Sequence, residues 1–140
     1  MSFQFTRKLT VEWGHCDPAG IVFNPRLFEF FDWSTALLLR AALGVDKADM
    51  LSAYGVAGIP LVDSRATFLR PSHYGEEIEI ISNVTAVGRS SFGIAHKLFN
   101  GGALAVEAHE KRVWTVRDAA TGCLKSQPMP RDVAIRLNGG

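Results

Sequence analysis

The sequence predicts an α+β domain in which an antiparallel five- to six-stranded sheet wraps around one long central helix. The first observation is the order of the segments, which is one strand, then one long helix, and then a run of strands. This order does not build the alternating βαβ units of a doubly wound fold. The second observation is that the long helix, from Leu27 to Leu43, is apolar nearly all round, which is typical of a helix covered by a sheet.

The composition narrows the class of protein. The 140 residues, of which 47% are hydrophobic and 21% charged, favour a single domain over residues 1–140 with a substantial core. A net charge of +1 without a basic run gives no case for binding nucleic acid, and no apolar run is long enough to cross a membrane. Cys16 and Cys123 lack CxxC spacing, so we expect free thiols and a cytoplasmic protein.

The first strand and the long helix have clear sequence signals. Apolar residues occupy nearly every odd position from Phe3 to Trp13, which predicts a half-buried strand. Asn24-Pro25 then predicts a helix start with Asn24 as N-cap, because Pro suits the first helical position. Gly44 is the expected terminator of this helix.

The rest of the chain predicts mainly strands. The expected elements are a short helix over Lys47–Tyr54, strands over Pro60–Leu69, Glu76–Val87, Ser91–Asn100 and Leu104–Arg117, a short strand or turn near Cys123–Ser126, and a terminal helix near Arg131–Asn138. Asn100-Gly101-Gly102 indicates a hairpin. A sheet around one helix leaves an outer face and edges to cover, so we expect a homo-oligomer.

The segment WGHCDPAGIVFNP, residues 13–25, holds more reactive and backbone-bending residues than a plain turn needs. His15, Cys16 and Asp17 do not form a proton relay in that order, because adjacent side chains of an extended chain point to opposite faces. Cys16 as a nucleophile would need a distant His, such as His96 or His109. The four histidines lack a metal-binding spacing such as HxxxH, so no metal site is predicted.

The motif Asp17-Pro18-Ala19-Gly20, followed by Ile21-Val22-Phe23-Asn24-Pro25 and the helix, resembles the acyl-CoA thioesterases of the hot-dog fold, of the 4-hydroxybenzoyl-CoA thioesterase type. The resemblance extends over nearly the whole chain, including Gly58–Val62 and the turn Gly88–Phe92. It implies a hot-dog homodimer or homotetramer with active sites at subunit interfaces. It also implies hydrolysis of an acyl-CoA substrate without a metal or an organic cofactor.

Thioester hydrolysis needs a carboxylate and an oxyanion donor. The resemblance makes Asp17 the carboxylate, either as nucleophile or as general base for water, although Asp-Pro also starts ordinary turns. The expected oxyanion donor is the backbone N–H of Asn24, since helix N-termini carry free N–H groups and Pro25 has none. Gly20 allows positive φ or a close approach of the backbone to the thioester.

The predicted substrate-binding residues fall into three groups. For the acyl group we expect the helix side chains Phe23, Phe28 and Asp32, with Asp32 accepting a hydrogen bond from a polar acyl group such as a phenol. The alternative is that Glu29, Asp32 and Thr35 form a solvated stripe. For the CoA part we expect Ile59, Pro60, Leu61 and Val62 along the pantetheine arm, and Arg89, Ser90 and Ser91 at the phosphates.

Two alternative functions remain open at this point. One is a hydratase or dehydratase on the same fold, which His15 beside Asp17 keeps in view. The other is a module that binds acyl-CoA without cleaving it. The acyl group itself is also open between hydroxybenzoyl, other aryl, and short or medium aliphatic chains.

Overall fold

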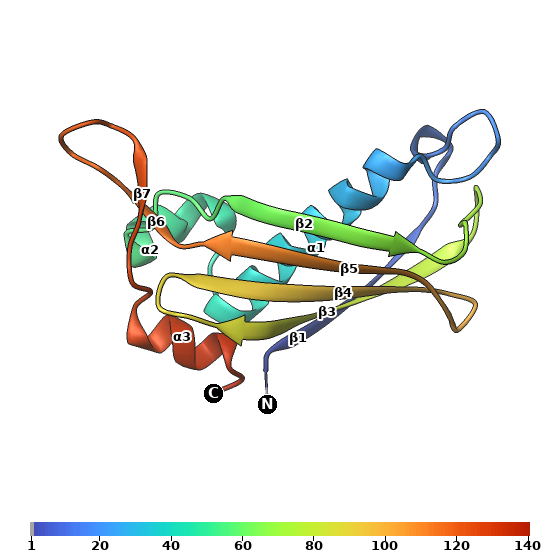
Figure 1. The fold of residues 1–140 in the computed structure, drawn as a ribbon. Coiled ribbons are helices and arrows are strands. Elements are labelled where there is room, and N and C mark those ends of the chain that lie inside the picture. The colour runs from blue at the N-terminus through green and yellow to red at the C-terminus, as the bar shows by residue number, and fades with distance from the viewer. Residues whose placement is uncertain (1) are drawn as a thin grey trace.

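One five-stranded antiparallel sheet, with its strands in the spatial order β1-β3-β4-β5-β2, forms the body of the structure (Figure 1). The computed structural model describes residues 2–140. Helix α1 (Asn24–Leu43) crosses one face of this sheet, which confirms the predicted α+β arrangement. The strands of the sheet are β1 (Gln4–Thr10), β2 (Leu61–Phe68), β3 (Glu77–Val87), β4 (Ser91–Asn100) and β5 (Ala103–Val113).

The first strand is shorter than predicted. Its side chains alternate between half-buried and exposed positions as expected, but β1 ends at Thr10. Trp13 belongs instead to a short 3-10 helix, η1 (Trp13–His15), and its side chain is exposed. A hydrogen bond from the His15 N–H to the Glu12 carbonyl closes this turn, so the chain leaves the sheet before it reaches the Asp17 loop.

Helix α1 begins one residue earlier than the capping pattern predicts. Asn24 is its first residue, and Phe23, with φ −65° and ψ 127°, is the N-cap, so the assignment of Asn24 as N-cap was wrong. Phe23 has no hydroxyl or amide to cap with, and the tight Phe23 carbonyl to Arg26 N–H bond closes the first turn in its place. Gly44 ends the helix in the left-handed region, with φ 74°, as predicted.

The second half of the chain contains one wrong strand boundary. The run predicted as a single strand over Leu104–Arg117 breaks at Trp114, whose side chain is buried and whose N–H donates to the Ser90 carbonyl. After this break, β6 (Thr115–Arg117) pairs with β7 (Leu124–Ser126) in a separate two-stranded sheet. Gly101 and Gly102 both have positive φ, which confirms the hairpin between β4 and β5.

The remaining helices lie at one end of the molecule. The predicted helix over Lys47–Tyr54 is a 3-10 turn, η2 (Lys47–Asp49), that continues into α2 (Met50–Tyr54). The terminal helix, α3 (Arg131–Leu137), packs beside the C-terminal half of α1. No helix among residues 2–140 is long and apolar enough to cross a membrane.

The core lies between α1 and the sheet. Buried residues of α1, such as Phe31 and Leu38, contribute to two apolar clusters, one at each half of the helix. In the part of the chain that the structure describes, strand β2 pairs only with β5, which leaves its other edge open, and Leu61, Val62 and Phe68 on this strand are exposed. An open edge with apolar side chains is a typical surface for pairing with a second chain.

Candidate active site

The Asp17 loop is a hydrogen-bonded turn with one free carboxylate oxygen. The Asp17 N–H donates to the Ile21 carbonyl at 2.9 Å, and the Gly20 N–H donates to the Asp17 carbonyl at 2.9 Å. One carboxylate oxygen, Oδ1, accepts from the Ala19 N–H at 2.9 Å. Gly20 has φ 80°, which a residue with a side chain rarely adopts. The turn holds Asp17 half-buried, and within residues 2–140 its Oδ2 has no hydrogen bond.

The start of α1 lies directly after this loop. The Phe23 N–H donates to the His15 carbonyl at 2.9 Å, and the Val22 N–H donates to the Ser72 carbonyl at 2.9 Å, so the loop and the helix start are held together. Among residues 2–140 no acceptor receives the Asn24 N–H. A free N–H at the positive end of a 20-residue helix is a ready oxyanion donor.

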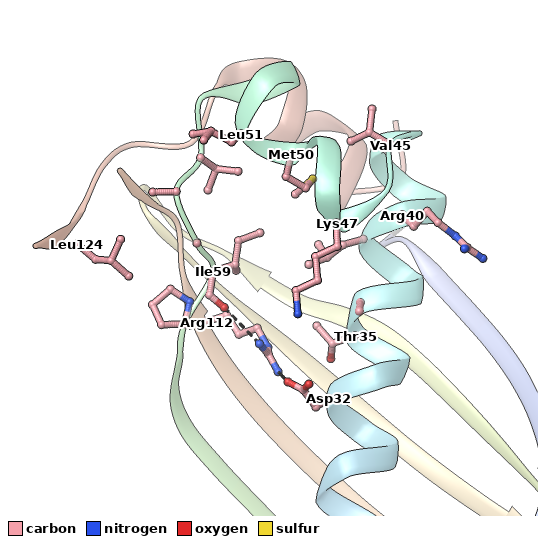
Figure 2. A pocket seen from close by; sticks show the side chains of 16 residues that line it. Asp32, Thr35, Arg40, Val45, Lys47, Met50, Leu51, Ile59, Arg112 and Leu124 are labelled. Atoms are coloured by element: carbon pink, nitrogen blue, oxygen red, sulfur yellow. Dashed lines mark hydrogen bonds and ion pairs between the residues drawn. The ribbon is translucent and has the colours of Figure 1, made fainter. Parts of the chain in front are cut away.

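A cavity of about 420 Å³ lies at the other end of α1 (Figure 2). Its walls are the C-terminal half of α1, the η2–α2 turn and the segment before β2. Most of the lining is apolar, and Asp32 and Arg112 form a polar corner of the cavity. The volume is in the range of small-molecule sites. The apolar lining includes Leu39, Val45, Met50, Val56, Ile59 and Pro60.

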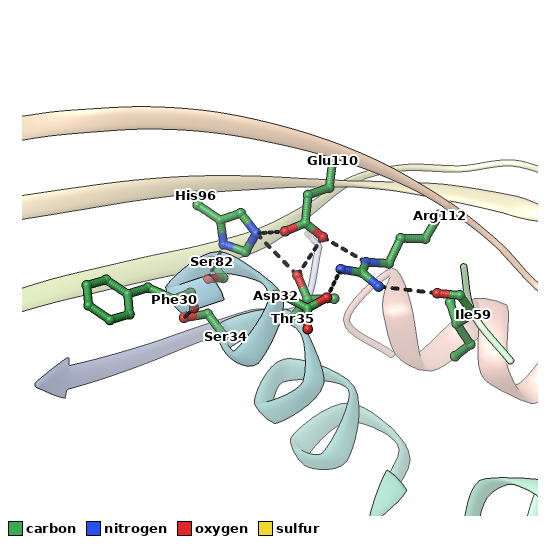
Figure 3. Close-up of polar contacts among 9 residues, drawn as sticks. All are labelled: Phe30, Asp32, Ser34, Thr35, Ile59, Ser82, His96, Glu110 and Arg112. Carbon is green, nitrogen blue, oxygen red and sulfur yellow. Dashed lines mark hydrogen bonds and ion pairs between the residues drawn. The ribbon is translucent and has the colours of Figure 1, made fainter. Parts of the chain in front are cut away.

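Arg112 joins Asp32 to a buried polar network between α1 and the sheet (Figure 3). Its Nη2 donates to Asp32 Oδ1 at 2.6 Å, its Nε to Glu110 Oε1 at 2.7 Å, and its Nη1 to the Ile59 carbonyl at 3.2 Å. Glu110 also accepts from the Thr35 hydroxyl at 2.9 Å. The predicted solvated stripe is therefore wrong for Thr35, which is buried in this network.

His96 continues the network away from the cavity. Its Nε2 lies 2.7 Å from Glu110 Oε2, and its Nδ1 lies 2.7 Å from the Ser82 hydroxyl. The ring also stacks on Phe31, with centroids 5.0 Å apart. His96 is therefore fully engaged within the core and is not a partner for Cys16, whose thiol donates to the Glu12 carbonyl at 3.6 Å.

The groups around Glu110 and Arg112 keep both of these buried side chains charged. Burial alone raises the pKa of the Glu110 carboxyl, but the hydrogen bonds and charges of His96 and Arg112 more than offset this effect, so the pKa lies below the ordinary value of 4.5. Burial alone lowers the pKa of the Arg112 guanidinium, but Glu110 and Asp32 together raise it above its ordinary value. Glu110 is therefore an anion and Arg112 a cation at neutral pH.

The structure separates the predicted site residues into two groups. The catalytic candidates Asp17, Gly20 and Asn24 lie together at the N-terminal end of α1. Phe23 is exposed beside them, and Phe28 packs edge to face on Phe68 at 6.3 Å. Asp32 lies eight residues along the helix from Asn24, which is roughly 12 Å of helix rise. The second group lies at the far end of the sheet and consists of Asp32, Ile59, Pro60, Leu61, Val62, Arg89, Ser90 and Ser91.

The sequence reasoning missed the network itself. The signal was present in β5, where Glu110 and Arg112 occupy the same face as the buried Ala108 and Val106. Two charged residues on the buried face of a strand point to a paired site in the interior. From the sequence, His96 is considered as a partner of Cys16 and as a metal ligand, but not as a buried residue of a polar network, although it too occupies a buried position in β4.

The fold and the sequence together define the class of the protein. Residues 11–137 match the thioesterase-like superfamily, and the chain belongs to this family. The predicted hot-dog fold and the predicted enzyme class, a thioester hydrolase, are thereby confirmed.

Three similar proteins are informative. The 1,4-dihydroxy-2-naphthoyl-CoA hydrolase of Synechococcus elongatus is 26% identical over 129 residues, which cover 92% of this chain and 86% of the relative. The 4-hydroxybenzoyl-CoA thioesterase of Pseudomonas sp. strain CBS-3 is 27% identical over 138 residues, covering 94% of this chain and 96% of the relative. A crystal structure of a mutant 4-hydroxybenzoyl-CoA thioesterase with 4-hydroxybenzoyl-CoA superposes with a TM-score of 0.87 at 25% identity, covering 97% of this chain and 99% of that one.

The lowered pKa of Glu110 predicts an acid-dependent loss of stability. Because the pKa of Glu110 is lower in the folded state, its ionised carboxylate stabilises the fold fully at pH values above the unfolded-state pKa near 4.5. This stabilisation is lost as the pH falls through the pKa of the folded state. We expect Glu110→Gln to lower the free energy of unfolding by about 3–5 kcal/mol at neutral pH, because Arg112 loses its buried counterion.

Denaturant unfolding at a series of pH values tests this expectation. The difference between wild type and Glu110→Gln should shrink as the pH falls below 4.5. Glu77→Gln, which changes an exposed carboxylate of the same type on β3, is the matched control for a general effect of losing one acidic group. A difference that stays constant from neutral to acid pH would contradict the assignment.

Proposed function

We propose that the protein hydrolyses an acyl-CoA thioester to a free acid and CoA, with Asp17 as the reacting carboxylate. The observation that carries this proposal is the pairing of two unused groups, Asp17 Oδ2 and the Asn24 N–H, at the start of the same helix. Thioester cleavage needs a nucleophile or a general base for water, and it needs an oxyanion donor. A carboxylate can fill the first role and a free backbone N–H the second.

The chemistry at this end of α1 follows from the two groups. The thioester carbonyl oxygen accepts from the Asn24 N–H, and the positive end of the helix stabilises the negative charge that develops there. Asp17 Oδ2 either attacks the carbonyl carbon or takes a proton from water. In the first case a mixed anhydride forms, CoA leaves as the thiolate, and water then cleaves the anhydride and restores Asp17. In the second case the water oxygen attacks the carbonyl carbon, the C–S bond breaks with CoA leaving as the thiolate, and the proton held by Asp17 is released to restore the carboxylate. No metal or organic cofactor takes part in either route.

The active site is composed of two chains in this proposal. Antiparallel pairing of β2 with β2 of a second copy covers the open edge and its exposed residues Leu61, Val62 and Phe68. This pairing places the start of one β2 beside the end of the other. The end of β2, at Phe68, borders a groove shared with Asn24, whereas the start of β2 follows the cavity segment at Ile59. The carboxylate of one chain therefore faces the cavity of its partner in a homodimer or homotetramer.

The CoA part of the substrate fits the same arrangement. Arg89 and Ser90 lie in the β3–β4 turn and Ser91 is the first residue of β4, at the cavity end of the sheet and far from Asp17 of their own chain. In the two-chain site, the thioester group lies at Asp17 of one chain. The CoA part of the same substrate then passes along the end of the partner's sheet that holds the cavity. Arg89 of that chain is then the cationic group available for a phosphate.

The acyl group favoured by the cavity is a hydroxylated aryl group. An apolar cavity of about 420 Å³ suits one or two aromatic rings, and Asp32 supplies an acceptor for a ring hydroxyl. The relatives named above act on 4-hydroxybenzoyl-CoA and 1,4-dihydroxy-2-naphthoyl-CoA, which both carry such hydroxyls. A short or medium aliphatic acyl group would offer no hydroxyl to Asp32 Oδ2, the carboxylate oxygen that Arg112 does not hold.

The alternative functions have weaker support. A hydratase would need a free His, but His15 accepts the Glu12 N–H at 2.9 Å and packs edge to face on Phe30. A binding module without catalysis would release no thiol from bound acyl-CoA. Measurement of free thiol therefore separates it from a thioesterase.

The thiol-release assay also tests Asp17. We expect wild type to release CoA from 4-hydroxybenzoyl-CoA, and Asp17→Asn to lower kcat at least about 100-fold because the carboxylate is lost. Asp132→Asn, an exposed change on α3, is the control and should leave kcat unchanged. Activity that survives Asp17→Asn would overturn the mechanism. A single turnover in isotopically labelled water then separates the two routes, because label enters Asp17 only if its carboxylate attacks.

Mixing two inactive variants tests whether the site is shared between chains. The first variant, Asp17→Asn, lacks the carboxylate but keeps an open cavity. The second variant, Ala36→Trp, keeps the carboxylate, and its tryptophan fills its own cavity. In mixed dimers one of the two shared sites has neither change, so statistical mixing should restore about a quarter of wild-type activity. If carboxylate and cavity of the same chain worked together, every site would keep one defect and mixing would restore nothing.

A further inference from the structure

Asp32 is an exposed carboxylate with one hydrogen-bond partner among residues 2–140, and that partner, Arg112, is unusually well fixed. Its side chain is 63% exposed, and an ion pair of this exposure usually holds a side chain only loosely. Its partner Arg112, however, is only 10% exposed. The two other contacts of Arg112, with Glu110 and the Ile59 carbonyl, hold the plane of the guanidinium at separate points. The end of the Arg112 guanidinium that faces the cavity is therefore preorganised to bind Asp32.

Glu110 is fixed in turn by donors from three other side chains. Because an ionised carboxylate only accepts hydrogen bonds, His96 Nε2 must carry a proton toward Glu110 Oε2. In the neutral ring Nδ1 then accepts from the Ser82 hydroxyl. The Thr35 hydroxyl and Arg112 Nε fill Glu110 Oε1. No member of this chain of contacts is free to turn without leaving a buried polar group unpaired, which costs free energy.

Attachment of α1 to the sheet does not by itself explain the network. Apolar side chains of similar volume would attach the helix as well, because buried ion pairs seldom add net stability. The network also has a direction: it starts at Ser82 in β3 and ends at Asp32 on the cavity wall (Figure 3). At that end Asp32 Oδ2 has no hydrogen bond within residues 2–140 and remains available to a ligand.

We propose that Arg112, supported by Glu110 and His96, is a positioning residue that holds Asp32 as a fixed acceptor for a hydroxyl of the acyl group and thereby sets the preference of the enzyme for hydroxyaryl thioesters. This inference rests on the proposed thioesterase function. The guanidinium holds Asp32 Oδ1, and Oδ2 accepts the ring hydroxyl. An acyl group without the hydroxyl leaves Oδ2 desolvated and unpaired, and sites of this kind discriminate strongly against such analogues.

The test is a double-mutant cycle on two substrates that differ only in the hydroxyl, 4-hydroxybenzoyl-CoA and benzoyl-CoA. The readout is the ratio of their kcat/KM values. Arg112→Lys keeps a cation beside Glu110, but a single ammonium cannot reproduce the fork that reaches Asp32. We expect Arg112→Lys and Asp32→Asn each to lower the ratio of 4-hydroxybenzoyl-CoA to benzoyl-CoA about 10- to 100-fold. This is the effect expected from the loss of one hydrogen bond to a charged group. The double variant should lower it no further than the stronger single variant.

Thr35→Val provides a second variant if Arg112→Lys does not fold. It removes one donor to Glu110 without leaving a charge unpaired, and it should lower the ratio in the same direction by a smaller factor. Circular dichroism of each variant shows that folded protein is compared. An equal loss on both substrates, or effects of Arg112→Lys and Asp32→Asn that multiply, would overturn the positioning role.

The outcome for wild type separates this inference from the function on which it rests. If wild type hydrolyses both thioesters equally well, the inference fails and the thioesterase function stands. If wild type releases no thiol from either thioester while it binds both, the proposed function fails and the inference fails with it.

Discussion

Helix α1 packs across one face of the sheet, and this packing fixes the positions of two candidate site groups, the Asn24 N–H and the Asp32 side chain. The buried side chains of Phe31 and Leu38 pack the two halves of the helix against the sheet. The hydrogen bond from Thr35 to Glu110 attaches the middle of the helix to β5. The free Asn24 N–H at its start and the Asp32 side chain further along are therefore rigidly spaced by the helix itself. Sites built on such an element are placed more precisely than sites on loops.

The same packing separates the two groups of candidate site residues within one chain. The candidate carboxylate Asp17 and the candidate oxyanion donor Asn24 lie at one end of the sheet, and the cavity with its polar corner lies at the other. Strand β2 connects the two ends along the open edge, so a second copy paired there brings unlike ends together. The symmetric dimer that we propose would cover the exposed apolar residues of β2 and bring the two separated groups together.

Much of the fold and part of the site could be predicted from the sequence. Local signals sufficed for the strand pattern of β3 and β4, for the Gly44 helix end and for the Asp17 loop, because each depends on residues close in the chain. The misplaced features depend on tertiary contacts. Trp114 breaks a run of strand residues because it is buried in the core, and Asn24 lost the capping role because Phe23 is held by His15. The Glu110–His96 contact joins two strands and could not be read from either alone.

The central claim is that the Asn24 N–H and Asp17 of one chain act on a thioester whose acyl group lies in the cavity of the other chain. A crystal structure of the Asp17→Asn variant with 4-hydroxybenzoyl-CoA tests it most directly. We expect the thioester carbonyl oxygen about 3 Å from the Asn24 nitrogen, with the ring in the partner's cavity and its hydroxyl on Asp32. A thioester carbonyl bound away from the start of α1, or a ring outside the cavity, would contradict it.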